Sequence, residues 1–166
     1  MPTTILKGDL FETAGLKAFA QACSRDGTLD AGIAVAFRKR WPRMAEDCAQ
    51  RCRDKRPALG DVFVWSDDDV VVYSLVTEER RAADPKSSGR SGGQMSALAR
   101  AVRQMIALAQ QGGVTRIGIP RIGAGPKGLD WKRVRSFLVE EGEKTPVELL
   151  VFEQFIRARP APVPEG

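Results

Sequence analysis

The sequence predicts an α/β fold of three layers, α/β/α, in which helices cover both faces of a mixed central β-sheet. Short apolar runs typical of buried strands alternate with longer segments whose apolar residues recur at helical spacing. Two of the runs, residues 61–65 and 70–76, flank a turn of three aspartates, which predicts one antiparallel hairpin. With 166 residues, 43% of them hydrophobic, the chain is long enough for one domain with a substantial core.

Proline and glycine set the boundaries of the individual elements. Trp41-Pro42 should separate two helices, because proline suits the first turn of a helix and not its interior. In chain order, the predicted elements are strands at 3–7 and 16–22, a helix that begins within 30–34 and continues through Phe37, a helix at 42–54, the hairpin strands 61–65 and 70–76, a helix at 95–111, a strand between Gly113 and Pro120, a helix at 131–141 and a strand at 147–152.

Two segments are expected to lie outside these elements. Residues 78–94 are polar and rich in glycine and serine, and they bury too little apolar surface to form an element. They form either a flexible surface loop or a loop that covers a substrate, because long loops in compact domains often carry function. The domain is assigned to residues 1–156, and residues 157–166 form a Pro-rich C-terminal tail.

Composition limits the available chemistry. The chain has no histidine, which excludes Ser-His, Cys-His and histidine–metal mechanisms and leaves carboxylates, lysines, backbone donors and water. Three cysteines, Cys23, Cys48 and Cys52, favour reduced thiols over a disulfide framework, and without histidine they make a poor zinc site. We therefore expect no metal and no cofactor.

Charge and hydropathy point to no special surface. The formal net charge is +5, but basic residues are scattered and often stand beside acidic ones, and one Tyr and three Trp are too few for a nucleic-acid groove built on aromatic stacking. No apolar run approaches the ~18 residues of a membrane helix, and the first residues show no signal-peptide pattern. A cytoplasmic monomer without membrane contact is the expectation.

The most informative segment is the glycine-rich stretch at residues 117–131. A short apolar strand leads into a loop with Gly123, Gly125 and Gly128, and a helix opens near Asp130. Glycine lets backbone N–H groups approach an oxyanion, and the start of a helix adds unpaired donors and the positive end of its dipole. The stretch predicts a phosphate-binding loop, although its spacing matches neither the Walker nor the dinucleotide motif; an ordinary tight turn is the alternative.

Three candidate ligand segments fall at the carboxyl ends of predicted strands. They are Gly8-Asp9-Leu10, residues 30–34 and residues 123–128. Ligands of open α/β sheets bind beyond the carboxyl ends of the strands. The three segments therefore predict a single pocket.

At these segments the chain resembles the macrodomain family, the α/β/α modules that bind ADP-ribose. Gly8-Asp9-Leu10-Phe11 is similar to the family's opening motif, Ala31-Gly32-Ile33-Ala34 to its first phosphate loop, and Pro120-Arg121-Ile122-Gly123-Ala124-Gly125 to its second. The order and separation match from about residue 3 to residue 152. The branch that it resembles contains the terminal ADP-ribose protein glycohydrolase, the DNA ADP-ribosyl glycohydrolase antitoxins and the chromatin-remodeller macrodomain.

The resemblance implies a role for each matched position. Asp9 would accept a hydrogen bond from the adenine amino group, or else cap a turn or helix. Backbone N–H groups of the two loops would hold the two phosphates, and Phe152, expected to end the last strand, would lie against adenine or belong to the core. The predicted ligand-binding residues are Asp9, Leu10, Gly32, Ile33, Ala34, Thr77, Arg121, Ile122, Gly123, Ala124, Gly125 and Phe152.

The family's catalytic residues are replaced in this sequence. The ester-cleaving glycohydrolase and the antitoxins carry a lysine just after the strand that matches residues 73–77, where this chain has Glu78-Glu79. The human-type enzyme also has a catalytic aspartate in the second loop, and its position falls on Lys127. What remains is a carboxylate that orients or deprotonates water beside the distal ribose, with Asp130 preferred and Glu78 as the other candidate. Asp130 suits the N-cap of the last helix equally well.

The predicted function is that of a macrodomain that binds ADP-ribose and hydrolyses mono-ADP-ribose from acidic side chains of modified proteins. A non-catalytic reader of ADP-ribosylated macromolecules and a phosphatase acting on ADP-ribose phosphate are the alternatives. The expected partners are ADP-ribose and mono-ADP-ribosylated proteins, and ADP-ribosylated nucleic acid is a further candidate.

Overall fold

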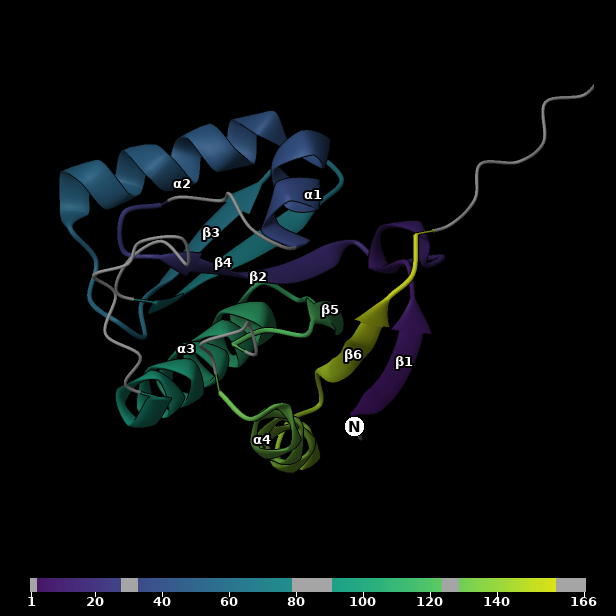
Figure 1. The fold of residues 1–166 in the computed structure, drawn as a ribbon. Coiled ribbons are helices and arrows are strands. Elements are labelled where there is room, and N and C mark those ends of the chain that lie inside the picture. The colour runs from purple at the N-terminus through teal and green to yellow at the C-terminus, as the bar shows by residue number, and fades with distance from the viewer. Residues whose placement is uncertain (1–2, 28–32, 79–90, 124–128, 158–166) are drawn as a thin grey trace, which may run out of the picture.

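A six-stranded sheet between two layers of helices forms the fold, in a computed structural model that describes residues 3–27, 33–78, 91–123 and 129–157 (Figure 1). The three-layer α/β/α fold with a mixed sheet is confirmed. In chain order the elements are β1 (Thr4–Gly8), η1 (Leu10–Glu12), β2 (Ala18–Ser24), α1 (Ile33–Arg40), α2 (Pro42–Lys55), β3 (Val62–Ser66), β4 (Val71–Glu78), α3 (Ser91–Gln111), β5 (Arg116–Pro120), α4 (Trp131–Glu143) and β6 (Glu148–Phe155).

The strand order in the sheet is β1-β6-β5-β2-β4-β3. Every neighbouring pair is parallel except β3 with β4, which is the predicted hairpin. The five parallel strands therefore end along one edge of the sheet, which we call the carboxyl edge. Loops and helix starts meet there, as in other α/β sheets.

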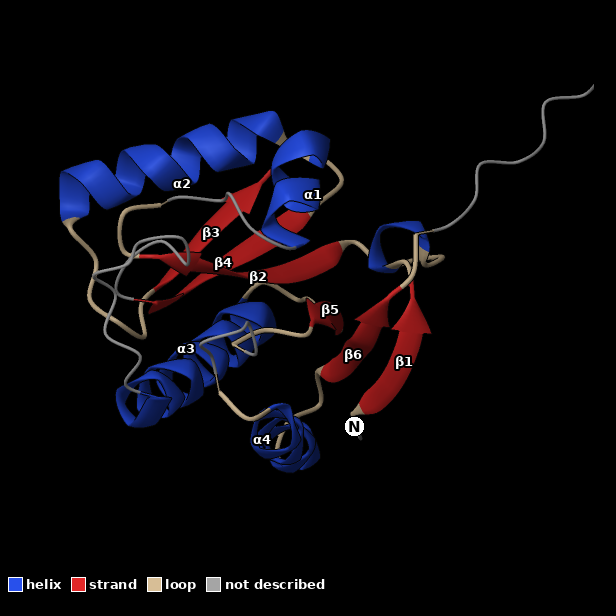
Figure 2. Cartoon of the chain, viewed as in Figure 1, coloured by secondary structure: helices blue, strands red, loops and turns tan. Residues whose placement is uncertain are grey.

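Each face of the sheet packs against its own pair of helices (Figure 2). On one face, Leu98 and Met105 of α3 and Leu138 of α4 belong to one apolar cluster. On the other face, Phe37 of α1 and Met44 of α2 belong to a second. Among the described residues, no helix is both long enough and apolar enough to cross a membrane.

Several predicted boundaries were wrong. Residue 78 and residues 91–94 do not belong to the irregular segment predicted at 78–94, because β4 continues to Glu78 and α3 begins at Ser91. The first turn of a helix needs no apolar face, so composition could not locate this start. The second strand begins at Ala18 instead of residue 16, and the apolar Leu16 is buried from the preceding loop. Residues 79–90 and the tail residues 158–166 lie outside the described chain.

The three cysteines are buried free thiols on the α1/α2 face. A hydrogen bond with the Cys48 thiol, a second with Cys52 and burial raise the pKa of Cys23. The same contact with Cys23 is the main cause that lowers the pKa of Cys48. The described residues contain no group of three His, Cys, Asp or Glu side chains arranged to hold a metal ion.

Candidate functional site

The candidate site lies along the carboxyl edge. Strand pairing places Gly8 opposite Phe155, and Ser24 opposite Glu78. The ends of β1, β6, β2 and β4 are therefore level with one another, although they are far apart in the sequence. Gly32 of the first predicted phosphate loop and Ala124 and Gly125 of the second lie outside the described residues.

Asp9 stands at the end of β1, where the opening motif was predicted to act. Its Oδ1 accepts a hydrogen bond of 3.0 Å from the backbone N–H of Phe11, so the carboxylate caps the short helix η1. The half-buried side chain is thereby fixed at the carboxyl edge. The next residue, Leu10, is fully buried, so it presents no accessible surface to a ligand.

Aromatic side chains gather next to Asp9. The Phe11 ring lies 5.0 Å from that of Phe37, 5.5 Å from Trp41 and 6.0 Å from Phe155, measured between ring centroids. We call this set the aromatic end of the edge. Its exposed member is Phe155, with 38% of its surface accessible.

The placement of Phe152 at the end of the last strand was wrong. β6 continues for three more residues, because its pairing with β1 extends to Gly8 opposite Phe155. Phe152 is 4% exposed and belongs to the cluster on the α1/α2 face. The sequence analysis did not identify Phe155 as a candidate at the strand end, because the apolar run in the sequence stops at Phe152.

Ile33 and Ala34 begin α1, after the first predicted loop. They are half-buried and pack against the apolar cluster on the α1/α2 face. The first N–H groups of a helix have no partner within it. These two residues therefore stand where the resemblance requires backbone donors.

The second predicted loop leaves β5 through Ile122 and Gly123. Gly123 has a φ of +74°, a left-handed conformation that glycine adopts without strain. Its carbonyl accepts a hydrogen bond of 2.6 Å from the N–H of Leu129, so Gly123 and Leu129 are held next to each other. Ile122 is buried. Gly123 therefore stands at the carboxyl edge, at the start of the predicted phosphate loop.

Arg121 is exposed beside this loop and stacks on an aromatic ring. Its guanidinium lies 5.4 Å from the ring centroid of Trp131, at the start of α4. The Trp131 indole N–H donates in turn to Glu153 at 3.3 Å, which ties α4 to β6. Arg121 is therefore held against the base of α4.

Thr77 and Glu78 end β4. Thr77 is 2% exposed, and its hydroxyl has no hydrogen-bond partner among the described residues. An unpaired buried hydroxyl costs about 1–3 kcal/mol, so a polar ligand atom that reached it would recover that energy. Glu78 is half-buried, and its carbonyl accepts a hydrogen bond of 2.9 Å from the N–H of Arg25, just after β2.

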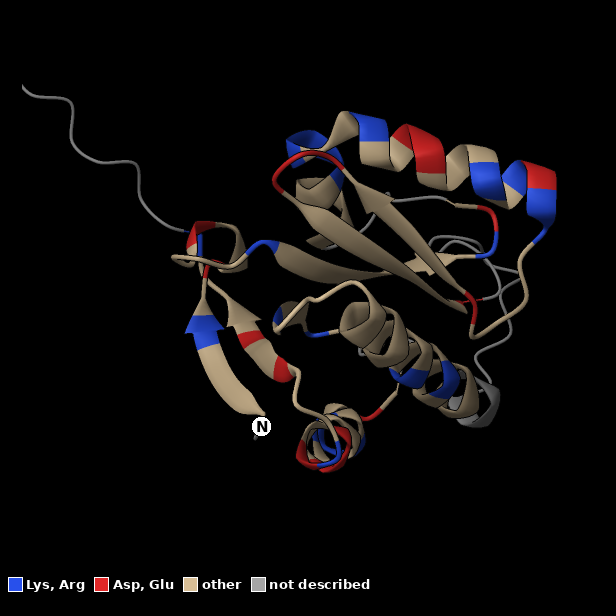
Figure 3. Ribbon diagram, turned by 180° about the vertical axis from the view of Figure 1, so that it is seen from behind, with Lys and Arg blue, Asp and Glu red and all other residues tan. Residues whose placement is uncertain are grey.

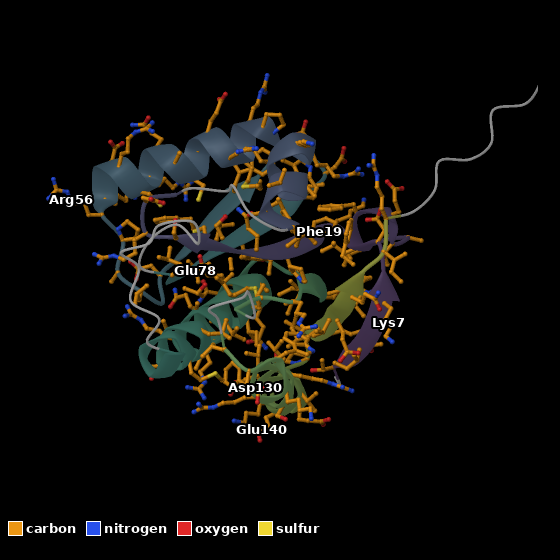
Figure 4. The ribbon with its side chains drawn as sticks, viewed as in Figure 1. Lys7, Phe19, Arg56, Glu78, Asp130 and Glu140 are labelled. Atoms are coloured by element: carbon orange, nitrogen blue, oxygen red, sulfur yellow. The ribbon has the colours of Figure 1, made fainter. Side chains whose placement is uncertain are left out.

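Asp130 is exposed and acts as the N-cap of α4, where its Oδ1 accepts a hydrogen bond of 3.1 Å from the N–H of Lys132. Glu78 belongs to the sheet and Asp130 to the start of a helix, and Figure 4 shows the two residues well apart. The structure does not bring the two predicted catalytic carboxylates together.

The family model described as "Macro domain" matches residues 20–138. The chain belongs to this family. The human "ADP-ribose glycohydrolase OARD1" is 30% identical over 149 residues, which cover 90% of each protein. An "ADP-ribose 1''-phosphate phosphatase" of Candida albicans is 30% identical over 141 residues, covering 81% of this macrodomain and 90% of the relative.

Two further relatives carry the same domain. A "DNA ADP-ribosyl glycohydrolase" of Mycobacterium tuberculosis is 25% identical over 84% of this macrodomain and 38% of its own length. The solved macrodomain of Thermus aquaticus DarG superposes with a TM-score of 0.76 at 22% identity, covering 91% of this chain and 97% of that one. The predicted resemblance to the macrodomain family is confirmed.

Proposed function

We propose that this macrodomain binds ADP-ribose along the carboxyl edge and hydrolyses mono-ADP-ribose esters formed with acidic side chains of modified proteins. The observation that carries the proposal is the convergence of β1, β2, β4 and β5 on one edge, with Asp9, Thr77 and Gly123 at their ends. The name of the human relative, an ADP-ribose glycohydrolase aligned over 90% of the chain, supports the same reaction class.

The order of the residues along the edge suggests how the ligand lies. Adenine would occupy the aromatic end, between the Asp9 carboxylate and the exposed Phe155 ring, because aromatic faces stack on a purine. The diphosphate would follow, held by backbone N–H groups at the start of α1 and in the loop after Gly123. The distal ribose would then reach Thr77 and Glu78 at the end of β4.

In the proposed reaction, Glu78 orients a water molecule and takes its proton. The water oxygen forms a bond to the anomeric carbon of the distal ribose, and the bond from that carbon to the side-chain carboxylate breaks. The carboxylate leaves as a stable anion, so the step needs positioning and a base but no strong general acid. Asp130 is assigned the structural role, since its carboxylate caps α4.

Two alternative functions would use the same site. The Candida relative at 30% identity favours a phosphatase acting on ADP-ribose 1''-phosphate, which the same diphosphate site would bind. A reader without catalysis follows if Glu78 cannot replace the family's lysine. Proteins that carry ADP-ribose are the proposed partners, and ADP-ribosylated nucleic acid is the other macromolecular class.

The experiment measures release of free ADP-ribose from glutamate-linked, serine-linked and DNA-linked substrates, together with phosphate release from ADP-ribose 1''-phosphate. The proposal expects the fastest turnover on the glutamate ester. Faster phosphate release would establish the phosphatase. Tight ADP-ribose binding without turnover on any substrate would establish the reader.

A further inference from the structure

Helix α4 carries its charges against its own dipole. Apart from its two capping residues, basic side chains stand in its first half and acidic ones in its second, namely Lys132, Arg133 and Arg135 against Glu140, Glu141 and Glu143. The start of a helix is the positive end of its dipole, so acidic residues stabilise the start and basic residues the end. A charge pattern that opposes this local rule indicates a partner outside the helix.

Four residues of α4 form a stripe on the side away from the core. They are Lys132, Ser136, Val139 and Glu143, spaced four, three and four residues apart. This spacing places them in one row along a helix, opposite the buried residues of α4 such as Val134. All four are exposed, Val139 with 36% of its surface accessible. We call them the outer stripe.

The outer stripe lies at the periphery of the molecule. Figure 3 shows α4 at the margin of the ribbon, beside α3, and in Figure 4 the neighbouring Glu140 lies at the outer limit of the side chains. Lys132, Ser136 and Val139 line a shallow depression on this side. Among the described residues, Val139 is the only exposed large hydrophobic side chain on a helix. The stripe therefore has an apolar centre between two charged ends.

The ion pairs of α4 lie on its flanks and do not use the stripe. Arg135 pairs with Glu153 at 3.1 Å, and Glu141 pairs with Arg103 at 3.1 Å. Four charged residues of α4 form no ion pair within the described part of the chain, namely Lys132, Arg133, Glu140 and Glu143. Contacts within the chain therefore do not explain the charge pattern of this side.

We propose that the outer stripe binds the outer stripe of a second copy of this chain, with the two α4 helices antiparallel. With the two-fold axis at the middle of the stripe, Lys132 of one copy lies opposite Glu143 of the other. Ser136 lies opposite Val139 in the same way, and its small side chain lets the helices approach. A two-fold axis repeats each contact, so one stripe is complementary to itself.

The charges beside the stripe fit the same arrangement. Arg133 and Glu140 flank it on one side, so in an antiparallel pair Arg133 of one copy faces Glu140 of the other. A parallel pair would place like charges opposite each other, which is unfavourable. In the antiparallel pair, each basic helix start also lies beside the negative dipole end of the other helix. The charge pattern therefore selects both the partner and its orientation.

The contact is small, so the dimer should be a weak one. Residues 132–143 extend over roughly 17 Å at about 1.5 Å per residue. Two such helices bury less than the roughly 1,200 Å² of a stable interface. We expect a dissociation constant of about 10–100 μM, in contrast to the monomer expected from the sequence.

Sedimentation equilibrium of the full chain over about 1–500 μM measures the association. The average mass should rise from 18.1 kDa toward twice that value as the concentration increases. About 0.5 M salt should weaken the association several-fold, because it screens exposed ion pairs. A parent protein that keeps a mass of 18.1 kDa at the highest concentration would overturn the proposal.

Charge reversal tests the orientation. One variant combines Lys132→Glu with Arg133→Glu, and the other combines Glu140→Lys with Glu143→Lys. Each variant alone opposes like charges across the axis and should associate at least tenfold more weakly than the parent. An equimolar mixture should form a heterodimer at least as tight as the parent dimer, because every opposed pair is then complementary.

The same variants should remain folded. Each reversal places its new charges in agreement with the dipole of α4, so the melting temperature at low protein concentration should equal or exceed that of the parent. The matched control combines Glu46→Lys on α2 with Asp68→Lys in the β3–β4 turn, two exposed positions away from α4. It changes the net charge as much as Glu140→Lys with Glu143→Lys does, and it should dimerise like the parent.

Two results with the folded variants would also contradict the proposal. Parental association in either charge reversal would place the contact on another surface. A mixture that associates no more tightly than its separate components would exclude the antiparallel pairing of the two stripes. ADP-ribose takes no part in these measurements, so their outcome is independent of the proposed function.

Discussion

The two ends of the carboxyl edge differ in chemistry and in the way they are held. At the aromatic end, Asp9 is fixed by a cap, and the ring of the neighbouring Phe11 packs against Phe155. At the other end, Thr77 and Glu78 lie in a corner of backbone hydrogen bonds with Arg25. A ligand with a flat base at one end and a sugar and charged attachment at the other fits this polarity. In the proposed binding mode, the aromatic end binds the base and the other end carries out the chemical step. Substitutions can therefore test each end separately.

Glu78→Gln should have the largest effect at the chemical end. It removes the proposed base while keeping the side chain's shape, and loss of one acid–base group costs about 10²–10⁴ in rate. Turnover on a glutamate-linked substrate should fall in that range, whereas ADP-ribose affinity measured by calorimetry should change by less than about threefold. A variant with parental turnover would remove Glu78 from the mechanism.

Gly123→Val tests the middle of the edge. A β-branched residue is strained at the φ of +74° observed there, and the shifted loop would lose its backbone donors. We expect ADP-ribose affinity to drop by about 100-fold or more, on the order of three lost hydrogen bonds of about 1 kcal/mol each. Circular dichroism must show a folded variant, and parental affinity in that folded protein would reduce the loop to an ordinary turn.

Asp9→Ala tests the aromatic end. Loss of a hydrogen bond to a charged group costs about 1–3 kcal/mol, so ADP-ribose affinity should fall roughly 5- to 150-fold with little change in the rate at saturating substrate. Asp9→Asn keeps an acceptor for the Phe11 N–H and serves as the matched control for the cap. A fall in the saturated rate instead of the affinity would show that the two ends are not independent.

Asp130→Ala should have the smallest effect on catalysis. The side chain caps α4, so its removal should lower the free energy of unfolding by about 1 kcal/mol, visible as a melting point lower by about 2–4 °C. Turnover should stay within about tenfold of the parent's. A loss of 10²-fold or more at parental affinity would return the role of base to Asp130.

The sequence predicted the elements better than their ends. Helical spacing of apolar residues located α3, and Pro42 marked the break before α2, because these signals are local in the sequence. The end of β6 was misplaced, since Phe155 is held by pairing with Gly8, a contact between the two ends of the chain. Pairing of this kind leaves no local signal.

The site was predictable to a similar degree. Asp9 and Gly123 were predicted from their motifs and lie at the carboxyl edge, whereas Phe155 was not among the predicted residues. The corner beside Glu78 depends on Arg25, whose side chain donates to the carbonyl of Pro57 and whose backbone N–H donates to the carbonyl of Glu78, contacts that only the folded chain makes. The left-handed conformation of Arg56, which follows α2, was not predictable either, because glycine is the residue that usually indicates such a conformation at a helix end.

Titration of the purified protein with ADP-ribose, followed by calorimetry and by thermal unfolding, tests the central claim that the carboxyl edge binds this ligand. One molecule should bind per chain, and at about 100 times the dissociation constant the ligand should add about 2.7 kcal/mol of stability, which raises the melting temperature by several degrees. An unchanged melting temperature together with no heat of binding at saturating ADP-ribose would contradict the account.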